Sequence, residues 1–312
     1  MGKLDLQGIP VGAQIMLTLI IIFLSFLITM TLGALVGTLF FDNSITEILG
    51  LADFTDKSNL PLLKYLQITQ SIGLFIIPPF IAAGLFGSTI SSYLRFKNKP
   101  YPFVLIIVII LAIISTPFIN YLAELNANLK LPDSMERIEN WMKELEETAT
   151  ELTEMLISAN TFDVFLLNLF MIAVLPALGE ELLFRGVIQK QLTRFFRNHH
   201  AGIWVAAILF SALHMQFYGF IPRMFLGVLF GYLLVWTGSI WMPITAHFVN
   251  NASAVLFYYL FSNDLVNKEL ETIGAAESDM YYVIASMAGM FIFLFLIYRY
   301  QKIRSNHGSL SG

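Results

Sequence analysis

The stretch from Ile15 to Phe41, IMLTLIIIFLSFLITMTLGALVGTLFF, contains no charged side chain. A run of about 20 apolar residues is long enough to cross the hydrocarbon core of a bilayer as an α-helix, which satisfies its own backbone hydrogen bonds. This run is longer than the apolar core of a cleaved signal peptide, and a single lysine, Lys3, precedes it. We therefore expect an uncleaved signal anchor and an integral membrane protein.

The rest of the chain has the same character, since 57% of the 312 residues are hydrophobic and 13% are charged. Ordinary soluble domains contain about 25% charged residues. We predict an all-α, polytopic membrane protein with about eight transmembrane helices, formed by one membrane domain over residues 1–312. The expected spans are Ile15–Phe41, Leu62–Phe86, Phe103–Leu122, Phe162–Leu178, Ile203–Met215, Phe220–Trp236, Ile240–Phe261 and Tyr281–Tyr298.

Charge and cysteine content exclude several classes of function. The net charge of −4 offers no basic face for nucleic acid, whose binding depends on neutralising phosphates. The chain has no cysteine, which excludes disulfides, thiolate nucleophiles, iron–sulfur clusters and Cys-ligated zinc. Any chemistry must come from oxygen and imidazole groups.

The loops alternate in charge along the chain, which predicts the orientation, because cytoplasmic loops are enriched in Lys and Arg. Basic residues on one side are Lys3, Arg95, Lys97, Lys99, Lys190, Arg194, Arg197, Arg299, Lys302 and Arg304. Acidic residues on the other are Asp42, Glu47, Asp53, Asp56, the carboxylates between Glu124 and Asp163, and those from Asp264 to Asp279. We expect the basic side and both termini to be cytoplasmic, in a plasma (inner) membrane.

An amphipathic helix is expected between the third and fourth spans, at Asp133–Ile157, on the extracytoplasmic side. Its apolar residues recur at alternating spacings of three and four, and Asp133 with Glu136 could form a capping box after Pro132. Its polar face is acidic, which disfavours adsorption to anionic lipid. The segment is either a solvated bridge between spans or a surface for a partner.

Ionisable residues cluster within the apolar part of the chain, although each costs about 2.5–3.5 kcal/mol at a bilayer centre. The segment LPALGEELLFRGV, residues 175–187, places Glu181 and Arg185 four apart on one helical face, while Glu180 points about 100° away. We expect these residues at the cytoplasmic side of the fourth span, with Glu181 and Arg185 paired and Glu180 free. Alternatively, Glu180 only terminates a helix.

Two further motifs carry imidazole and carboxamide groups. Phe210 and His214 share one helical face, and so do His247 and Asn251, whereas Asn250 does not. Taken singly, each motif is compatible with a structural role, such as hydrogen bonds that join two membrane helices. Together with Glu180 they place a carboxylate, two imidazoles and a carboxamide on three apolar helices.

This set contains the groups needed for amide hydrolysis without a covalent intermediate. A carboxylate beside an imidazole can hold a water molecule and accept its proton. An imidazole and a carboxamide can donate hydrogen bonds to the oxygen of a tetrahedral intermediate. We find no serine nucleophile motif, which disfavours a serine mechanism.

The three motifs resemble those of the CAAX protease and bacteriocin-processing (CPBP/Abi) family of intramembrane proteases, which includes the CAAX prenyl endopeptidases. The family's Glu-Glu-x-x-x-Arg motif matches Glu180 to Arg185, its Phe-x-x-x-His motif matches Phe210 to His214, and its His-x-x-x-Asn motif matches His247 to Asn251. The resemblance covers a predicted catalytic core at 162–261.

The resemblance implies catalytic roles for four residues. Glu180 and His214 would act on water, and His247 and Asn251 would bind the oxyanion. Glu181, Arg185 and Phe210 would support them. It also implies a membrane-anchored or lipid-modified peptide as substrate, cleaved near the cytoplasmic face of the bilayer.

Two questions stay open at this point. Glu180, His214 and His247 match a common set of zinc ligands, but the His-Glu-x-x-His helix of many zinc proteases is absent, so the cofactor is either none or zinc. The fold could also serve as a noncatalytic scaffold or immunity protein. A transporter using Glu180 as proton carrier is disfavoured, because the sequence shows no inverted repeat.

Overall fold

The computed structural model of the chain describes residues 6–50, 57–98, 102–159, 161–263, 265–266 and 272–308, and within these ranges it contains helices and no strands. The all-α fold class is therefore confirmed. The predicted positions Lys3, Lys99, Asp53, Asp56 and Asp264 lie outside the described residues.

The apolar helices lie close to the predicted spans. The first three are α1 (Val11–Gly37), α3 (Leu60–Ser71) continued by η2 (Ile72–Ile76) and α4 (Ile77–Phe86), and α6 (Pro102–Ile114) with α7 (Thr116–Ala127). The fourth consists of α9 (Phe162–Asn168), η4 (Leu169–Val174), α10 (Leu175–Leu183), η5 (Phe184–Ile188) and α11 (Gln189–Phe196). The last four are α12 (His199–Ala212), α13 (Phe220–Thr237), α14 (Trp241–Ser262) and α15 (Met280–Gly308). Shorter elements are α2 (Ile45–Leu49), η1 (Lys57–Asn59), α5 (Ile90–Tyr93), η3 (Asp133–Met135), α8 (Glu136–Ile157), η6 (Phe217–Gly219) and η8 (Glu277–Asp279).

Six of these helical segments, within the described residues, are long and apolar enough to cross a bilayer. The two predicted spans outside this set are α12, which has 14 residues, and α14, which carries several polar side chains. A polytopic membrane protein is thus supported, and the count of eight spans stays a prediction.

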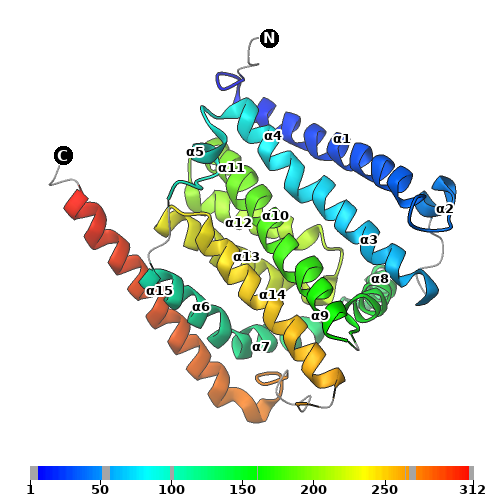
Figure 1. Cartoon of the computed structure of the whole chain (residues 1–312). Helices are drawn as coiled ribbons and strands as arrows, with labels where there is room; N and C mark the ends of the chain where they lie inside the picture. Colours follow the sequence, from blue (N-terminus) through cyan, green and yellow to red (C-terminus); the bar gives the residue numbers. More distant parts are fainter. Residues whose placement is uncertain are drawn as a thin grey trace.

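The helices form a row of neighbours. Figure 1 shows α1 beside α3 and α4, followed by α10, α14, α6 and α15, and each of these neighbours is in contact. The α12 and α13 helices lie behind α10 and α14, where α13 packs on both α12 and α14. The motif-bearing helices α10, α12 and α14 therefore occupy the middle of the molecule.

The loops that carry Lys and Arg meet at one end of the bundle. Near this end, Arg194 of α11 donates a hydrogen bond to Gln14 of α1 across 2.9 Å, and Asn98 donates to the carbonyl of Gly238 across 2.7 Å. We call this the basic end, and the opposite end, which carries α2 and α8, the acidic end. The compartment that each end faces stays a prediction.

The fourth span is longer than predicted. The sequence-based span ends at Leu178, whereas the helix continues without interruption to Phe196. Glu180 therefore lies 16 residues before the helix end, about 24 Å from it along the axis. The predicted end of the fourth span at Leu178 is wrong, because a charged motif in the middle of a helix was interpreted as the end of that helix. The depth of Glu180 in the bilayer stays a prediction.

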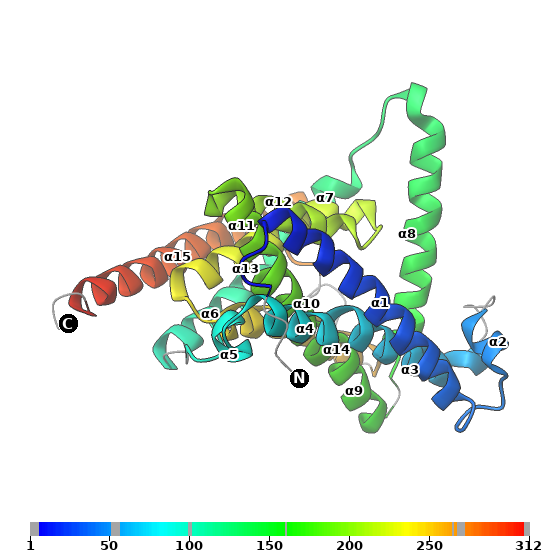
Figure 2. The same cartoon turned by 90° about the horizontal axis from the view of Figure 1, so that it is seen from above.

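The predicted amphipathic helix is present as η3 and α8, and its carboxylates lie along a mostly exposed surface. The expected capping box is wrong: the side chain of Asp133 makes no capping hydrogen bond, because a 3₁₀ turn at Asp133–Met135 precedes the α-helix. Figure 2 shows α8 standing apart from the packed helices, and Leu156 is its one buried residue among those described.

The orientation can be tested with single cysteines, because the native chain has none. We expect a membrane-impermeant maleimide to label Ser134→Cys in intact cells and to label Lys97→Cys only after lysis, since these exposed residues lie at opposite ends of the bundle. The reverse labelling pattern would invert the predicted topology.

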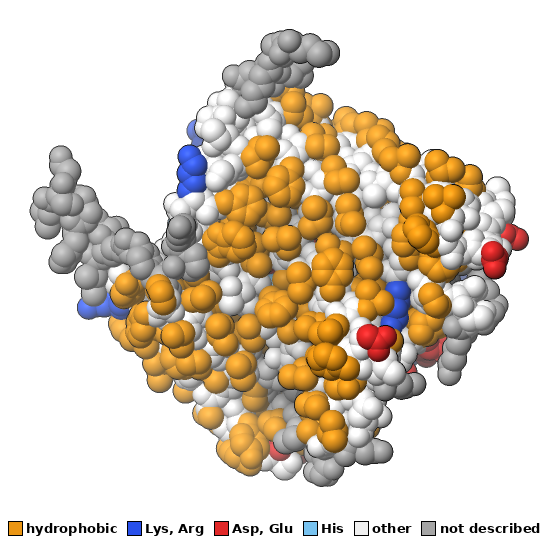
Figure 3. Space-filling view, viewed as in Figure 1, with side chains coloured by type: hydrophobic (Ala, Val, Ile, Leu, Met, Phe, Trp, Pro, Cys, Tyr) orange, Lys and Arg blue, Asp and Glu red, His pale blue; other side chains and the backbone are white. Residues whose placement is uncertain are grey.

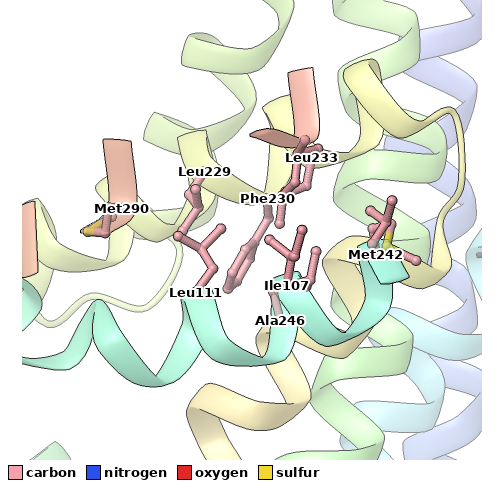
Figure 4. Close-up of a cluster of buried hydrophobic side chains, with 11 residues drawn as sticks. Ile107, Leu111, Leu229, Phe230, Leu233, Met242, Ala246 and Met290 are labelled. Carbon is pink, nitrogen blue, oxygen red and sulfur yellow. The ribbon is translucent and has the colours of Figure 1, made fainter. Parts of the chain in front are cut away.

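Apolar packing holds the helices around the site. Figure 4 shows a cluster in which Ile107 and Leu111 of α6 meet Phe230 of α13 and Ala246 of α14. The outer surface is also apolar, since hydrophobic side chains cover much of the face seen in Figure 3. Phe23 of α1 is among the large hydrophobic side chains that are exposed. Such a surface is expected where helices face lipid rather than water.

Candidate active site

The Glu181–Arg185 pair lies at the centre of the bundle. The side chains are 0% and 2% exposed, and Nε of Arg185 lies 3.0 Å from Oε2 of Glu181. The guanidinium also donates to the carbonyl of Gly227, across 3.3 Å, and lies over the ring of Phe210, 4.7 Å from its centroid. The ion pair expected from the spacing is therefore present, and it connects α10 to α12 and α13.

His247 of α14 is held by the same pair. Its Nδ1 lies 2.9 Å from Oε1 of Glu181, and its ring stacks on Phe230 at a centroid distance of 5.3 Å. A carboxylate only accepts, so Nδ1 carries the hydrogen. The opposite nitrogen, Nε2, lies 3.9 Å from Oε2 of Glu180. Glu181 therefore fixes the His247 ring with Nε2 toward Glu180.

Glu180 lies at a cavity of about 310 Å³, whose lining also includes His214, His247, Asn251 and Phe210. Its carboxylate is buried and has no Lys or Arg within ion-pair distance among the described residues. The helical-face argument thus separates two neighbours correctly: Glu181 is paired, and Glu180 faces the cavity.

His214 lies just beyond the end of α12. Its Nδ1 lies 2.8 Å from the carbonyl oxygen of Phe210, one helical turn earlier, and the two rings meet edge to face at 4.9 Å. Since a carbonyl only accepts, Nδ1 is the donor and Nε2 is left as an acceptor. The Phe210–His214 spacing therefore fixes both the position and the tautomer of this imidazole.

Asn251 connects α14 to an irregular part of the fourth span. Its Nδ2 donates to the carbonyl of Ile172 across 2.9 Å, while its Oδ1 accepts from Asn250 across 3.2 Å. Pro176, four residues after Ile172, has no N–H to offer that carbonyl. The Asn251 amide supplies a donor in its place, which orients the carboxamide at the cavity and leaves its second N–H uncommitted.

The backbone around Glu180 departs from α-helical geometry on both sides. The π-helical segments η4 and η5 flank α10, and such segments are frequent at functional sites. Gly179 allows α10 to approach η2 closely, since a Cβ there would lie 2.8 Å from Cβ of Phe75. The Pro176 and Gly179 positions therefore shape the wall that presents Glu180.

Four further polar residues line the cavity and were not predicted as site residues, namely Gln67, Thr153, Arg223 and Asn250. Arg223 of α13 lines the cavity, and its guanidinium donates to the side chain and the carbonyl of Gln216. A lone arginine in the apolar run FIPRMFLGVLF was a usable signal for it. Gln67 of α3 and Thr153 of α8 also line the cavity, and nothing in their local sequence indicated that.

The cavity lies on the acidic side of Glu180. Its lining includes Met171, Ile172 and Pro176, which precede Glu180 on the same helix. It also includes Thr153 and Leu156 of α8, which belongs to the acidic end. The cavity therefore extends from Glu180 toward the acidic end, and the membrane face at which cleavage takes place stays a prediction.

The three candidate zinc ligands do not form a metal-binding set in this structure. Among the described residues, no three His, Asp or Glu side chains lie close enough together to hold one ion. A shared ligand set of Glu180, His214 and His247 is therefore not supported.

Comparisons with known proteins agree with the motif-based resemblance. Residues 162–253 match the family model of the type II CAAX prenyl endopeptidase Rce1-like proteins. YpbD of Bacillus subtilis (strain 168) is 35% identical over 89 residues, which is 27% of this chain and 42% of the relative. The membrane-embedded CAAX protease MroQ of Staphylococcus aureus (strain USA300) is 27% identical over 121 residues, 37% of this chain and 47% of the relative.

The chain thus spans less than half the length of these two relatives in each alignment. No solved structure matches it. The matched segment contains all three motifs, so the resemblance to the CAAX protease family is confirmed over residues 162–253.

Proposed function

We propose that the protein is an intramembrane endopeptidase in which Glu180 and His214 activate a water molecule and His247 and Asn251 stabilise the oxyanion. The observation that carries the proposal is that these four side chains line one cavity, with Glu181 and Arg185 behind His247. The peptide substrate would be anchored in the bilayer or carry a lipid, as access to a cavity within the membrane requires.

The first step uses the free carboxylate. Water adds to the peptide carbonyl as Glu180 takes its proton, and the acceptor nitrogen Nε2 of His214 orients that water. The proton on Glu180 then passes to the leaving nitrogen as the C–N bond breaks. The products are a free carboxylate and a free amine, so no covalent enzyme intermediate is needed.

The second element is a pair of hydrogen-bond donors for the oxyanion. Asn251 offers its uncommitted N–H, and His247 offers Nε2–H when the ring carries a second proton. Glu181 would stabilise that charged ring through Nδ1. Removing one hydrogen-bond donor that points at the developing negative charge typically lowers the rate of hydrolysis by about 10²–10³-fold.

The cavity position directs cleavage to the part of the bilayer nearer the acidic end. Thr153 and Leu156 place α8 at the edge of the cavity, where its carboxylates favour a basic segment in the substrate or in a partner. With the orientation expected from the basic loops, this would be the extracytoplasmic half of the membrane.

The proposal is tested by cleavage of a membrane-anchored reporter peptide by the purified full chain. We expect turnover to persist after chelator treatment, with less than one zinc per chain by mass spectrometry, because the donor set does not converge on one ion. Stoichiometric zinc that is lost together with activity in His247→Ala would establish a metalloprotease instead. Absence of cleavage across anchored peptides would favour the noncatalytic alternative.

A further inference from the structure

A second cavity, of about 350 Å³, lies at the basic end of the bundle. It is formed by α5, the η5–α11 part of the fourth span, and the end of α13. Its charged lining consists of Arg95, Lys190, Arg194 and Arg185, and none of the described residues that line it is Asp or Glu. Four cationic side chains thus surround a space large enough for a small ligand.

Three of these cations have neutral partners. Arg95 donates to the carbonyl of Leu234 across 3.4 Å, Lys190 to the carbonyl of Tyr93 across 3.1 Å, and Arg194 to Gln14 across 2.9 Å. Within the described ranges, none of the three has a carboxylate within 4.0 Å. Neutral acceptors orient the side chains but leave their mutual repulsion uncompensated.

The aromatic ring of Tyr93 holds the central cation in place. The Nζ atom of Lys190 lies 3.5 Å from the centroid of this buried ring, within the range of a cation–π contact. The ammonium therefore has a fixed position at the cavity wall. A group held in this way is prepared for a ligand, because less side-chain entropy is lost on binding.

Arg185 adds an unsatisfied donor. This residue is 2% exposed, and its Nη1 has no hydrogen-bond acceptor among the described residues, although Nε binds Glu181 and Nη2 binds Gly227. A buried guanidinium nitrogen without an acceptor costs free energy. Arg185 also adds a positive charge to this wall of the cavity.

We propose that this cavity binds a phosphate group, namely the headgroup phosphate of an anionic phospholipid. Phosphate oxygens match the donors of arginine and lysine, and basic pockets between membrane helices suit anionic headgroups. The cavity lies near the ends of α11 and α13, and the ends of membrane-spanning helices are where lipid headgroups are expected. A zwitterionic choline headgroup would bring a cation against Arg95, Lys190 and Arg194 and is disfavoured.

The test uses the purified full chain in detergent and needs no peptidase activity, so it is independent of the proposed function. Native mass spectrometry would measure the dissociation constants of phosphatidylglycerol and phosphatidylcholine with identical acyl chains. We expect at least about tenfold tighter binding of phosphatidylglycerol, and a loss of about fivefold in Arg95→Gln and in Lys190→Gln, as expected for one cation each. Using both variants keeps the test valid if one fails to fold.

The matched control is Lys97→Gln, two residues from Arg95 on the same loop and outside the cavity lining. It should bind phosphatidylglycerol as the wild type does. Equal binding of both lipids, or an equal loss in Lys97→Gln and Arg95→Gln, would overturn the proposal. Inorganic phosphate is the second probe, and it should not raise the melting temperature. If it did so in the wild type and not in Arg95→Gln, the ligand would be a soluble phosphate rather than a lipid.

Discussion

Replacing Glu180 with glutamine is expected to remove cleavage of an anchored reporter while leaving the protein folded. The amide keeps the shape of the carboxylate but cannot accept the proton of the attacking water. Loss of a general base typically lowers the rate by about 10²–10⁴-fold, and Glu180 also returns the proton to the leaving nitrogen, so we expect the upper end of this range. Because Glu180 has no Lys or Arg partner among the described residues, the melting temperature in detergent should change little.

Glu277→Gln is the control for this variant. It makes the same chemical change at an exposed carboxylate on η8, outside the cavity lining, and should leave the rate unaltered. If Glu180→Gln turned over the reporter at a rate close to that of Glu277→Gln, Glu180 would be removed from the mechanism. Loss of monodisperse protein would instead indicate a structural role.

The positions of most membrane helices could be predicted from the sequence, because an apolar run has few alternatives in a bilayer. All eight predicted spans begin within four residues of the first residue of an apolar helix. The predicted end of the fourth span was wrong, because the charged motif resembles a helix end in a one-dimensional pattern. In the fold, Glu181 and Arg185 form an ion pair, and the helix continues through them to Phe196.

The candidate site was only partly predictable. Helical spacing correctly placed Glu180 and Glu181 on different faces and gave the Glu181–Arg185 contact. It could not give the contact of Glu181 with His247, because that depends on how α10 and α14 pack together. The participation of Thr153 from α8 depends likewise on the path of a long connection between spans.

Replacing Glu181 with glutamine is expected to lower both stability and cleavage, unlike Glu180→Gln. The substitution leaves Arg185, 2% exposed, without its carboxylate, and removing one partner of a buried ion pair typically costs about 3–5 kcal/mol. It also takes away the negative charge beside Nδ1 of His247. We therefore expect both a lower melting temperature and slower cleavage, whereas Glu180→Gln should affect cleavage alone.

A double variant separates these two effects. Glu181→Gln with Arg185→Met removes the unpaired cation, so much of the lost stability should return. Activity should not return, because His247 still lacks the carboxylate that orients and stabilises its ring. Two measurements on four proteins then suffice: melting in detergent and reporter cleavage for the wild type, both single variants and the double variant. An unchanged melting temperature in Glu181→Gln would contradict the ion pair, and recovery of cleavage in the double variant would show that Glu181 serves stability alone.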